Sequence, residues 1–226
     1  MKFKDLELSN CYAPPPAPSL PALPITSWLL LPQRVTVEVR VAQVASGNYL
    51  FLQQHTHPTF HALRSLDQQM RLCYAHPSCP ALPAPVEVGV ICAGQMPEGA
   101  WWRAQVMRYH QDSREVEVRY VDYGGYDTVR IESLRQIRSD FVSLPFQGSE
   151  VILDNLACLP EEEEFSASAK AALEELTQGA SLLAQVTDFH TSGIPLVQLW
   201  RKEGSEVVSV NQALVERGFC SWINAP

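Results

Sequence analysis

The chain has 226 residues, 46% of them hydrophobic, which is enough to form a sizeable core. Acidic residues outnumber basic ones by 25 to 17, and the net charge of -8 argues against nonspecific binding of nucleic acid and suits a basic peptide partner better. The sequence holds no apolar run near the roughly 20 residues that span a bilayer, so we expect a soluble fragment without direct membrane contact.

The first half of the chain contains a proline-rich start, a pair of strands and a helix. Residues 1–25 are rich in proline and are predicted to form a flexible, extended linker. In residues 26–57, valines alternate with polar residues from Val35 to Val41, and residues 49–53 form the partner strand. In residues 58–82, Pro58 can open a helix, and apolar side chains then recur at helical spacing from Phe60 to Tyr74.

Residues 83–141 are predicted to form a small barrel of five elements. These are a strand over residues 86–92, a loop over 94–99, a hairpin, a short strand over 127–131 and a helical turn over 132–137. Residues 142–226 follow with a strand at 150–153, a helix at 166–177, a hairpin of 182–189 and 196–200, a strand at 206–210, and a helix that Asn211 caps and Gly218 ends.

The central hairpin joins residues 99–106 to residues 115–126 and carries the most informative pattern of the chain. Side chains alternate faces along a strand, so each strand has one apolar face that ends in an aromatic ring, Trp102 on the first and Tyr120 on the second. For both faces to point inward, the loop around Gln111 to Arg114 must hold an odd number of residues, or a bulge must absorb one. Trp102 and Tyr120 are then predicted to meet at one end of the barrel, where their faces can bind a cation.

These residues resemble the signature of a known family. The run Trp102-Arg103-Ala104-Gln105-Val106, followed by Tyr120-Val121-Asp122-Tyr123-Gly124, is similar to that of extended Tudor domains. The resemblance covers residues 35–223 and implies a mainly β fold with some α: a small five-stranded Tudor barrel inserted into a split staphylococcal-nuclease-like (OB-type) barrel, joined by a linker helix. It also implies a non-enzymatic interaction module that reads methylated arginine and needs no cofactor.

The resemblance further implies an aromatic cage, which this sequence fills incompletely. The family's cage has four aromatic residues and an Asn that hydrogen-bonds the guanidinium group. Trp102, Tyr120 and Tyr123 match three aromatic positions, whereas Met96 stands at the fourth and Gly125 at the Asn position. Phe146 or Tyr126 could substitute in part, and the three rings could equally serve to cap the barrel core.

Three further stretches, at residues 54–63, 138–148 and 214–218, resemble the C-terminal Tudor region of mitochondrial kinase-anchoring scaffolds. The resemblance implies a place on the cytosolic face of the mitochondrial outer membrane. In such a scaffold the membrane anchor, the segment that binds the regulatory subunit of protein kinase A and an RNA-binding KH domain would lie upstream.

The sequence is also compatible with functions other than the reading of methylated arginine. Six arginines cluster in and after the small barrel and could contact RNA, although acidic residues balance them: Arg103, Arg108, Arg119, Arg130, Arg135 and Arg138. Binding of an unmodified peptide and formation of a homodimer are further alternatives. Catalytic carboxylate pairs, nucleophile motifs and phosphate loops are not recognised, and a zinc site built from His55, His57, His61, Cys73, His76 and Cys79 matches no common spacing.

Overall fold

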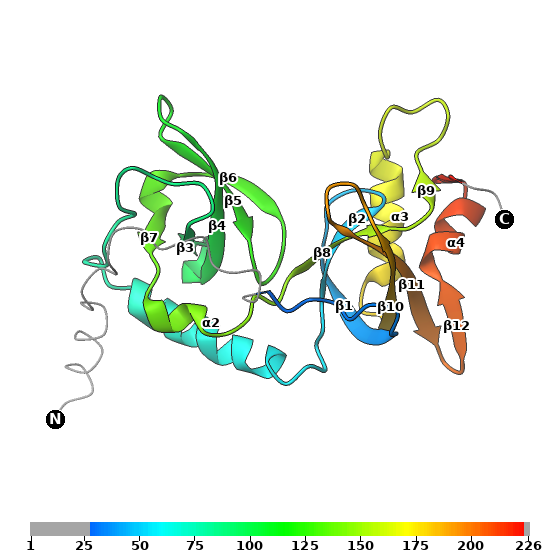
Figure 1. The fold of residues 1–226 in the computed structure, drawn as a ribbon, viewed down its shortest axis with the longest axis horizontal. Coiled ribbons are helices and arrows are strands. Elements are labelled where there is room, and N and C mark those ends of the chain that lie inside the picture. The colour runs from blue at the N-terminus through cyan, green and yellow to red at the C-terminus, as the bar shows by residue number, and fades with distance from the viewer. Residues whose placement is uncertain (1–27, 224–226) are drawn as a thin grey trace. The chain divides into compact units, whose positions relative to one another are not determined.

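The computed structural model describes residues 28–223, so the linker predicted for residues 1–25 lies outside the described residues. The chain forms two compact units, each assembled from separate stretches of sequence (Figure 1). In the described part, the first unit contains residues 28–29, 58–122 and 126–147, and the second contains residues 30–57, 123–125 and 148–223.

The first unit contains a five-stranded sheet with the strand order β6-β5-β4-β3-β7. Its strands are β3 (Ile91–Gln95), β4 (Trp101–His110), β5 (Glu115–Tyr120), β6 (Tyr126–Arg130) and β7 (Leu134–Gln136). One face of β4 and β5 forms the centre of its core, where Ala104, Val106, Val116 and Val118 are fully buried. The small five-stranded barrel expected from the sequence is therefore confirmed.

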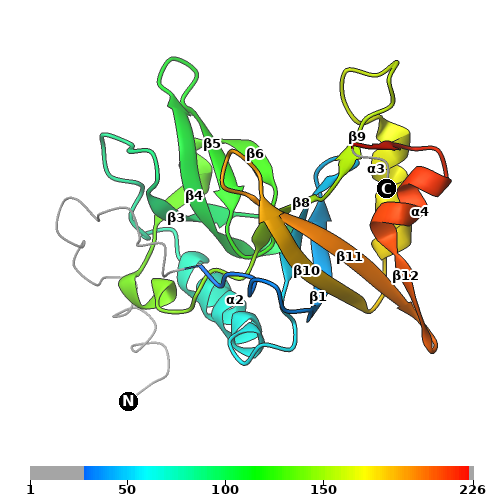
Figure 2. The same ribbon diagram turned by 45° about the vertical axis from the view of Figure 1, so that its right-hand side comes forward.

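Strands β4 and β5 form the predicted hairpin (Figure 2), and the register of their pairing contains the bulge that was predicted to bring both apolar faces to the same side. Val106 pairs with Val118, but the next pair is Arg108 with Glu117, so Met107 is the extra residue. The bulge restores the parity of the strand, because it shifts the register by one residue.

Two predictions in this unit were wrong. The strand expected over residues 86–92 begins only at Ile91 and continues through Gly94 and Gln95, which were expected to lie in a loop. Gly89 has a φ of +90°, which interrupts the extended conformation before Ile91. Residues 134–136, expected in a helical turn, form β7 and pair with β3, because Leu134 is fully buried in the barrel core there.

Helix α2 (Phe60–Tyr74) is confirmed and packs on the barrel of its own unit. Its apolar face buries Leu63, Leu66, Met70, Cys73 and Tyr74. The Tyr74 ring lies 5.2 Å from the ring of Trp101, and the Tyr74 hydroxyl donates a hydrogen bond to the carbonyl of Gln136 at 2.9 Å. The helix is therefore part of the barrel's packing through both ring contact and hydrogen bonding.

The second unit is built on a sheet with the order β10-β1-β2-β8-β11-β12. Its strands are β1 (Val37–Val44), β2 (Tyr49–Gln53), β8 (Ser149–Leu153), β10 (Leu182–Phe189), β11 (Pro195–Glu203) and β12 (Glu206–Ser209). Because β10 also pairs with β11, the five strands β1, β2, β8, β11 and β10 close into a barrel. This matches the split nuclease-like barrel expected from the sequence.

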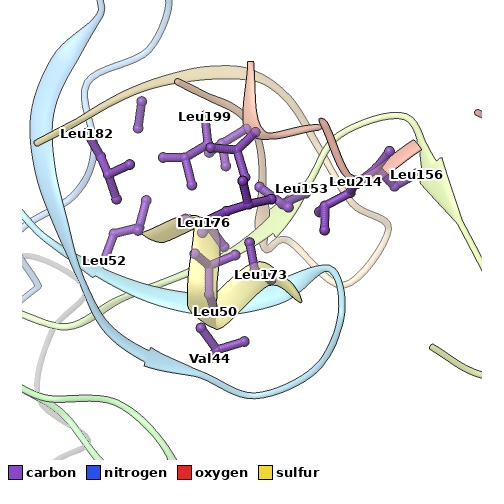
Figure 3. Close-up of a cluster of buried hydrophobic side chains, with 14 of the residues drawn as sticks. Val44, Leu50, Leu52, Leu153, Leu156, Leu173, Leu176, Leu182, Leu199 and Leu214 are labelled. Carbon is purple, nitrogen blue, oxygen red and sulfur yellow. The ribbon is translucent and has the colours of Figure 1, made fainter. Parts of the chain in front are cut away.

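Helices α3 (Ala167–Thr177) and α4 (Val210–Glu216) contribute to the core of the second unit. Figure 3 shows Leu173, Leu176 and Leu214 among the leucines of the barrel strands. The prediction that Asn211 caps the last helix was wrong, because the Ser209 side chain accepts the hydrogen bond from the backbone N–H of Gln212. Asn211 is instead buried, and its amide bonds the backbone at Leu199, Asp154 and Val197.

A short antiparallel pair of strands, β9 (Leu156–Ala157) with β13 (Ser221–Trp222), was not predicted from the sequence.

Over residues 28–223, the helices are all too short or too polar to cross a membrane.

Candidate functional site

Trp102 and Tyr120 come together at one end of the small barrel, as predicted. Tyr120 pairs directly with Ala104 on β4, and Trp102 lies two residues before Ala104 on the same face. The centroids of the two rings are 5.5 Å apart, and the ring planes meet at 85°. Trp102 is partly exposed, whereas Tyr120 is only 6% exposed and belongs to the barrel core. The two rings therefore form adjacent perpendicular walls, and Tyr120 also has a packing role.

A carboxylate lies beside this pair of rings. The Tyr120 hydroxyl donates a hydrogen bond to Oδ2 of Asp127 at 3.1 Å, and Asp127 is exposed on β6. Burial, together with the Asp127 charge, raises the pKa of Tyr120 well above its usual range, so the hydroxyl stays protonated and keeps donating. A negative charge close to aromatic faces favours the approach of a cation.

Met96 is the residue that the family resemblance predicts at the position of the fourth ring. It follows β3 directly, packs against the barrel core and is partly buried. Its N–H donates to the carbonyl of Ala100 at 2.8 Å, which closes the loop between β3 and β4. Its side chain thus packs on the barrel core, next to the strand that carries Trp102.

Phe146, one of the two residues considered as a substitute ring, is buried and packs against other residues of its own chain. It is 1% exposed, lies edge-on to Trp28 with 5.0 Å between ring centroids, and has the Arg103 guanidinium 4.7 Å above its ring. This prediction was therefore wrong, because a ring enclosed by its own chain cannot present a face to a ligand. Tyr126, the other candidate, is 48% exposed and pairs with Arg119 across β5 and β6.

Tyr123 and Gly125 lie in the short segment 123–125, which is grouped with the second unit. Tyr123 is partly buried, and both following glycines have positive φ, +78° at Gly124 and +91° at Gly125. Within that unit, Gly124 packs directly against Phe51, where a Cβ would come within 2.6 Å of Phe51 Cδ1. A Cβ at Gly125 would come within 2.8 Å of Gln43 Cδ and 2.9 Å of Gln43 Nε2. The positive φ favours glycine at both positions, and at Gly124 the Phe51 side chain, including its Cβ, also leaves no room for a Cβ.

The sequence did not reveal that Arg103 is the centre of a buried polar network. Its side chain is fully buried, and its Nε and Nη2 donate to the two carboxylate oxygens of Asp122 at 2.8 and 2.6 Å. Its remaining donors reach the carbonyls of Phe141, Leu144 and Pro145. Such a bidentate pair fixes the chain at Asp122, immediately before Tyr123. The signal for it was an arginine inside an apolar strand together with an aspartate just after the partner strand.

This network corrects the arginine cluster that was considered for RNA contact. Arg103 cannot reach a ligand, since its donors are used inside the protein. The Arg119 guanidinium lies 4.4 Å above the Trp28 ring, and burial lowers the pKa of Arg119. Arg138 pairs with Asp140 at 2.6 Å and covers the Phe141 ring at 4.1 Å. Much of the basic charge in this cluster therefore serves packing.

Two of the zinc candidates, His76 and Cys79, make hydrogen bonds within the protein. Cys79 donates from Sγ to the carbonyl of Cys73 at 3.1 Å, and the backbone N–H of Ser78 donates to Nδ1 of His76 at 3.3 Å. Within residues 28–223, no group of three or more His, Cys, Asp or Glu side chains is arranged to hold a metal ion.

Comparison with known proteins identifies the same family as the motifs. The Tudor domain model matches residues 31–155. The "A-kinase anchor protein 1, mitochondrial" of Mus musculus is 57% identical over 225 residues, which are 99% of this chain and 26% of that protein. The chain thus spans about a quarter of the length of that relative.

Two solved structures show a similar fold. Extended Tudor domain TD3 of mouse TDRD1, in complex with a MILI peptide containing dimethylarginine 45, superposes with a TM-score of 0.77 at 23% identity and covers 87% of this chain and 98% of its own. The human TDRD1 extended Tudor domain, in complex with a symmetrically dimethylated peptide, gives a TM-score of 0.73 at 25% identity and covers 86% and 94%.

Proposed function

Because the chain belongs to the Tudor domain family, we propose that it is a non-enzymatic protein-interaction module that binds peptides containing methylated arginine. The binding residues in this proposal are Trp102, Tyr120 and Tyr123, with Met96 and Gly125 at the two remaining positions of the cage. The partner is an arginine-rich segment, which suits a chain with a net charge of -8.

The perpendicular arrangement of Trp102 and Tyr120 supports the proposal most directly. The ring centroids of Trp102 and Tyr120 are 5.5 Å apart, the ring planes meet at 85°, and Asp127 accepts a hydrogen bond from the Tyr120 hydroxyl. This arrangement provides an aromatic face and a negative charge at one end of the barrel. A methylated guanidinium is a cation with a large apolar surface, and it gains from both. The extended Tudor domains of mouse and human TDRD1, which have the same fold, were solved with dimethylated peptides.

The proposed cage should bind more weakly than a complete one. Each cation–π contact contributes about 0.5–2 kcal/mol, depending on how far it is desolvated. Loss of one aromatic wall at Met96 and of one charge-assisted hydrogen bond at Gly125 would weaken binding by about tenfold to a few hundredfold.

Calorimetric titration tests this function directly. Arg-Gly peptides with symmetric dimethylation, asymmetric dimethylation or no modification are titrated into the protein up to millimolar concentration. We expect heat from the methylated peptides, and a loss of that heat in Trp102→Ala. A matched control is Tyr109→Ala, a partly buried aromatic residue on the same strand that lies outside the proposed cage.

The titration also separates the alternatives. Equal heats for the methylated and unmodified peptides would identify a binder of unmodified arginine peptides. A response to RNA that falls steeply with salt would favour RNA contact. An absence of heat at millimolar peptide, with an apparent mass twice that of the chain by light scattering, would favour self-association.

The wider context is part of the same proposal. The similarity to a mitochondrial A-kinase anchor protein supports a place on the cytosolic face of the mitochondrial outer membrane, as one domain of a scaffold. In that scaffold, binding of the regulatory subunit of protein kinase A and of RNA through a KH domain would belong to other segments. We therefore expect this chain alone to bind an arginine peptide without binding the kinase subunit, which a pull-down with the isolated chain can check.

A further inference from the structure

Strands β9 and β13 of the second unit bring two free cysteines opposite each other. Ser221 pairs with Ala157 in an antiparallel register. One residue further along, the same register places Cys158 across from Cys220, and both are free thiols. The Ser221 hydroxyl donates a hydrogen bond to the carbonyl of Cys158 at 3.2 Å, so the two segments are still adjacent at this point.

The hydrogen-bond pattern makes this the closer kind of cross-strand pair. Hydrogen-bonded and non-hydrogen-bonded pairs alternate along an antiparallel ladder. The N–H of Ile223 donates to the carbonyl of Asn155 at 3.0 Å, which makes that pair hydrogen-bonded. Counted along the ladder, the pair of Cys158 and Cys220 is then a non-hydrogen-bonded one. Such pairs have Cα atoms about 4.5 Å apart, within the roughly 4.4–6.8 Å that a disulfide spans.

Both thiols belong to the same face of the two strands. Leu156, two residues before Cys158, is part of the second unit's core, and Trp222, two residues after Cys220, packs against it. Because side chains alternate along a strand, the two cysteines share this face. Cys220 is 3% exposed, whereas Cys158 is partly exposed and its thiol donates to the carbonyl of Glu162 at 3.2 Å. A thiol is a weak donor, so this bond holds Cys158 only loosely.

We propose that Cys158 and Cys220 form a reversible disulfide by exchange with an oxidised low-molecular-weight disulfide such as glutathione disulfide. The Cys158 thiolate attacks the small disulfide, releases one small thiol and is left in a mixed disulfide. The Cys220 sulfur then attacks the Cys158 sulfur and releases the second small thiol, so the protein loses two protons and two electrons and the reagent gains them. Cys158 reacts first because it is the more exposed thiol, and because burial raises the pKa of Cys220 to about 11.

The bond would fasten β13 to β9. It closes a loop over residues 158–220, which contains α3, α4 and the strands β10, β11 and β12. Cross-linking a long loop stabilises the folded state mainly by restricting the unfolded chain. The second unit would therefore resist unfolding better under oxidising conditions, whether or not the first unit binds an arginine peptide.

Equilibration of the protein in glutathione buffers of graded potential tests the proposal. At each potential the free thiols are trapped with N-ethylmaleimide, and the non-reduced peptides are mapped by mass spectrometry. We expect a cross-linked peptide that joins Cys158 to Cys220. The melting midpoint of the oxidised protein should lie about 5–15 °C above that of the reduced protein. Dithiothreitol should reverse both changes.

Two cysteine variants serve as a matched pair. Cys158→Ser removes the partly exposed thiol and should show neither the cross-link nor the shift of the melting midpoint. Cys79→Ser, which removes a buried thiol of the first unit, should keep both. Melts of the reduced variants check that each one is folded.

Several results would overturn the proposal. One is alkylation of both thiols in the most oxidising buffer, and another is a cross-link that joins other cysteines. A mixed disulfide that persists on Cys158 would also overturn it, because the Cys220 sulfur would then be out of reach. A cross-link found only in the urea-unfolded chain would show that the fold does not bring the two thiols together.

Discussion

Substitution of Gly124 tests whether the segment 123–125 is fixed by its contact with Phe51. Gly124→Ala introduces two separate costs. At a φ of +78° an L-residue is disfavoured by about 1–2 kcal/mol. The new methyl group would also overlap the side chain of Phe51, including its Cβ. A Cβ does not move when the rotamer changes, so relief requires a shift of the backbone, and overpacking of this kind costs about 1–3 kcal/mol.

Urea denaturation of Gly124→Ala beside Gly218→Ala separates the two costs. Gly218 has nearly the same φ, +77°, lies in the same unit and has nothing within 4 Å of an added Cβ. The control should therefore lose only the conformational part, whereas Gly124→Ala should lose about 1–3 kcal/mol more. Equal losses in the two variants would refute the reasoning, because they would show that the contact with Phe51 does not constrain position 124.

Two further predictions concern buried charge. Arg103→Lys should lower the free energy of unfolding by about 3 kcal/mol, because lysine cannot make the bidentate pair and leaves Asp122 buried without full compensation; the exposed Arg108→Lys should be nearly neutral in the same urea titration. Burial raises the pKa of the Glu150 carboxyl above its usual range, so the folded state binds this proton more tightly than the unfolded state does. The resulting contribution to stability is present at low pH and is lost as the pH rises through the raised pKa. Glu150→Gln should therefore gain stability relative to wild type between pH 4 and pH 8, and a gain that does not change with pH in thermal melts would contradict this.

The sequence was sufficient for those features that depend on alternation and on local spacing. The apolar faces of β4 and β5 follow from the alternation of side chains along a strand. For both faces to point inward, that alternation required either an odd-numbered loop or a bulge, and the structure has the bulge at Met107. The strand over residues 49–53 was likewise predicted from local composition and is present as β2. Such patterns survive in a single sequence because each one is set by neighbours along the chain.

Features set by residues distant in sequence could not be predicted in the same way. Arg103 was assigned to a surface cluster because an arginine is usually exposed, and its partners at residues 141–145 lie far along the chain. Strand β7 was missed because its pairing with β3 brings together residues about forty positions apart. Asn211 was taken for a helix cap, yet its amide is buried and bonds β11.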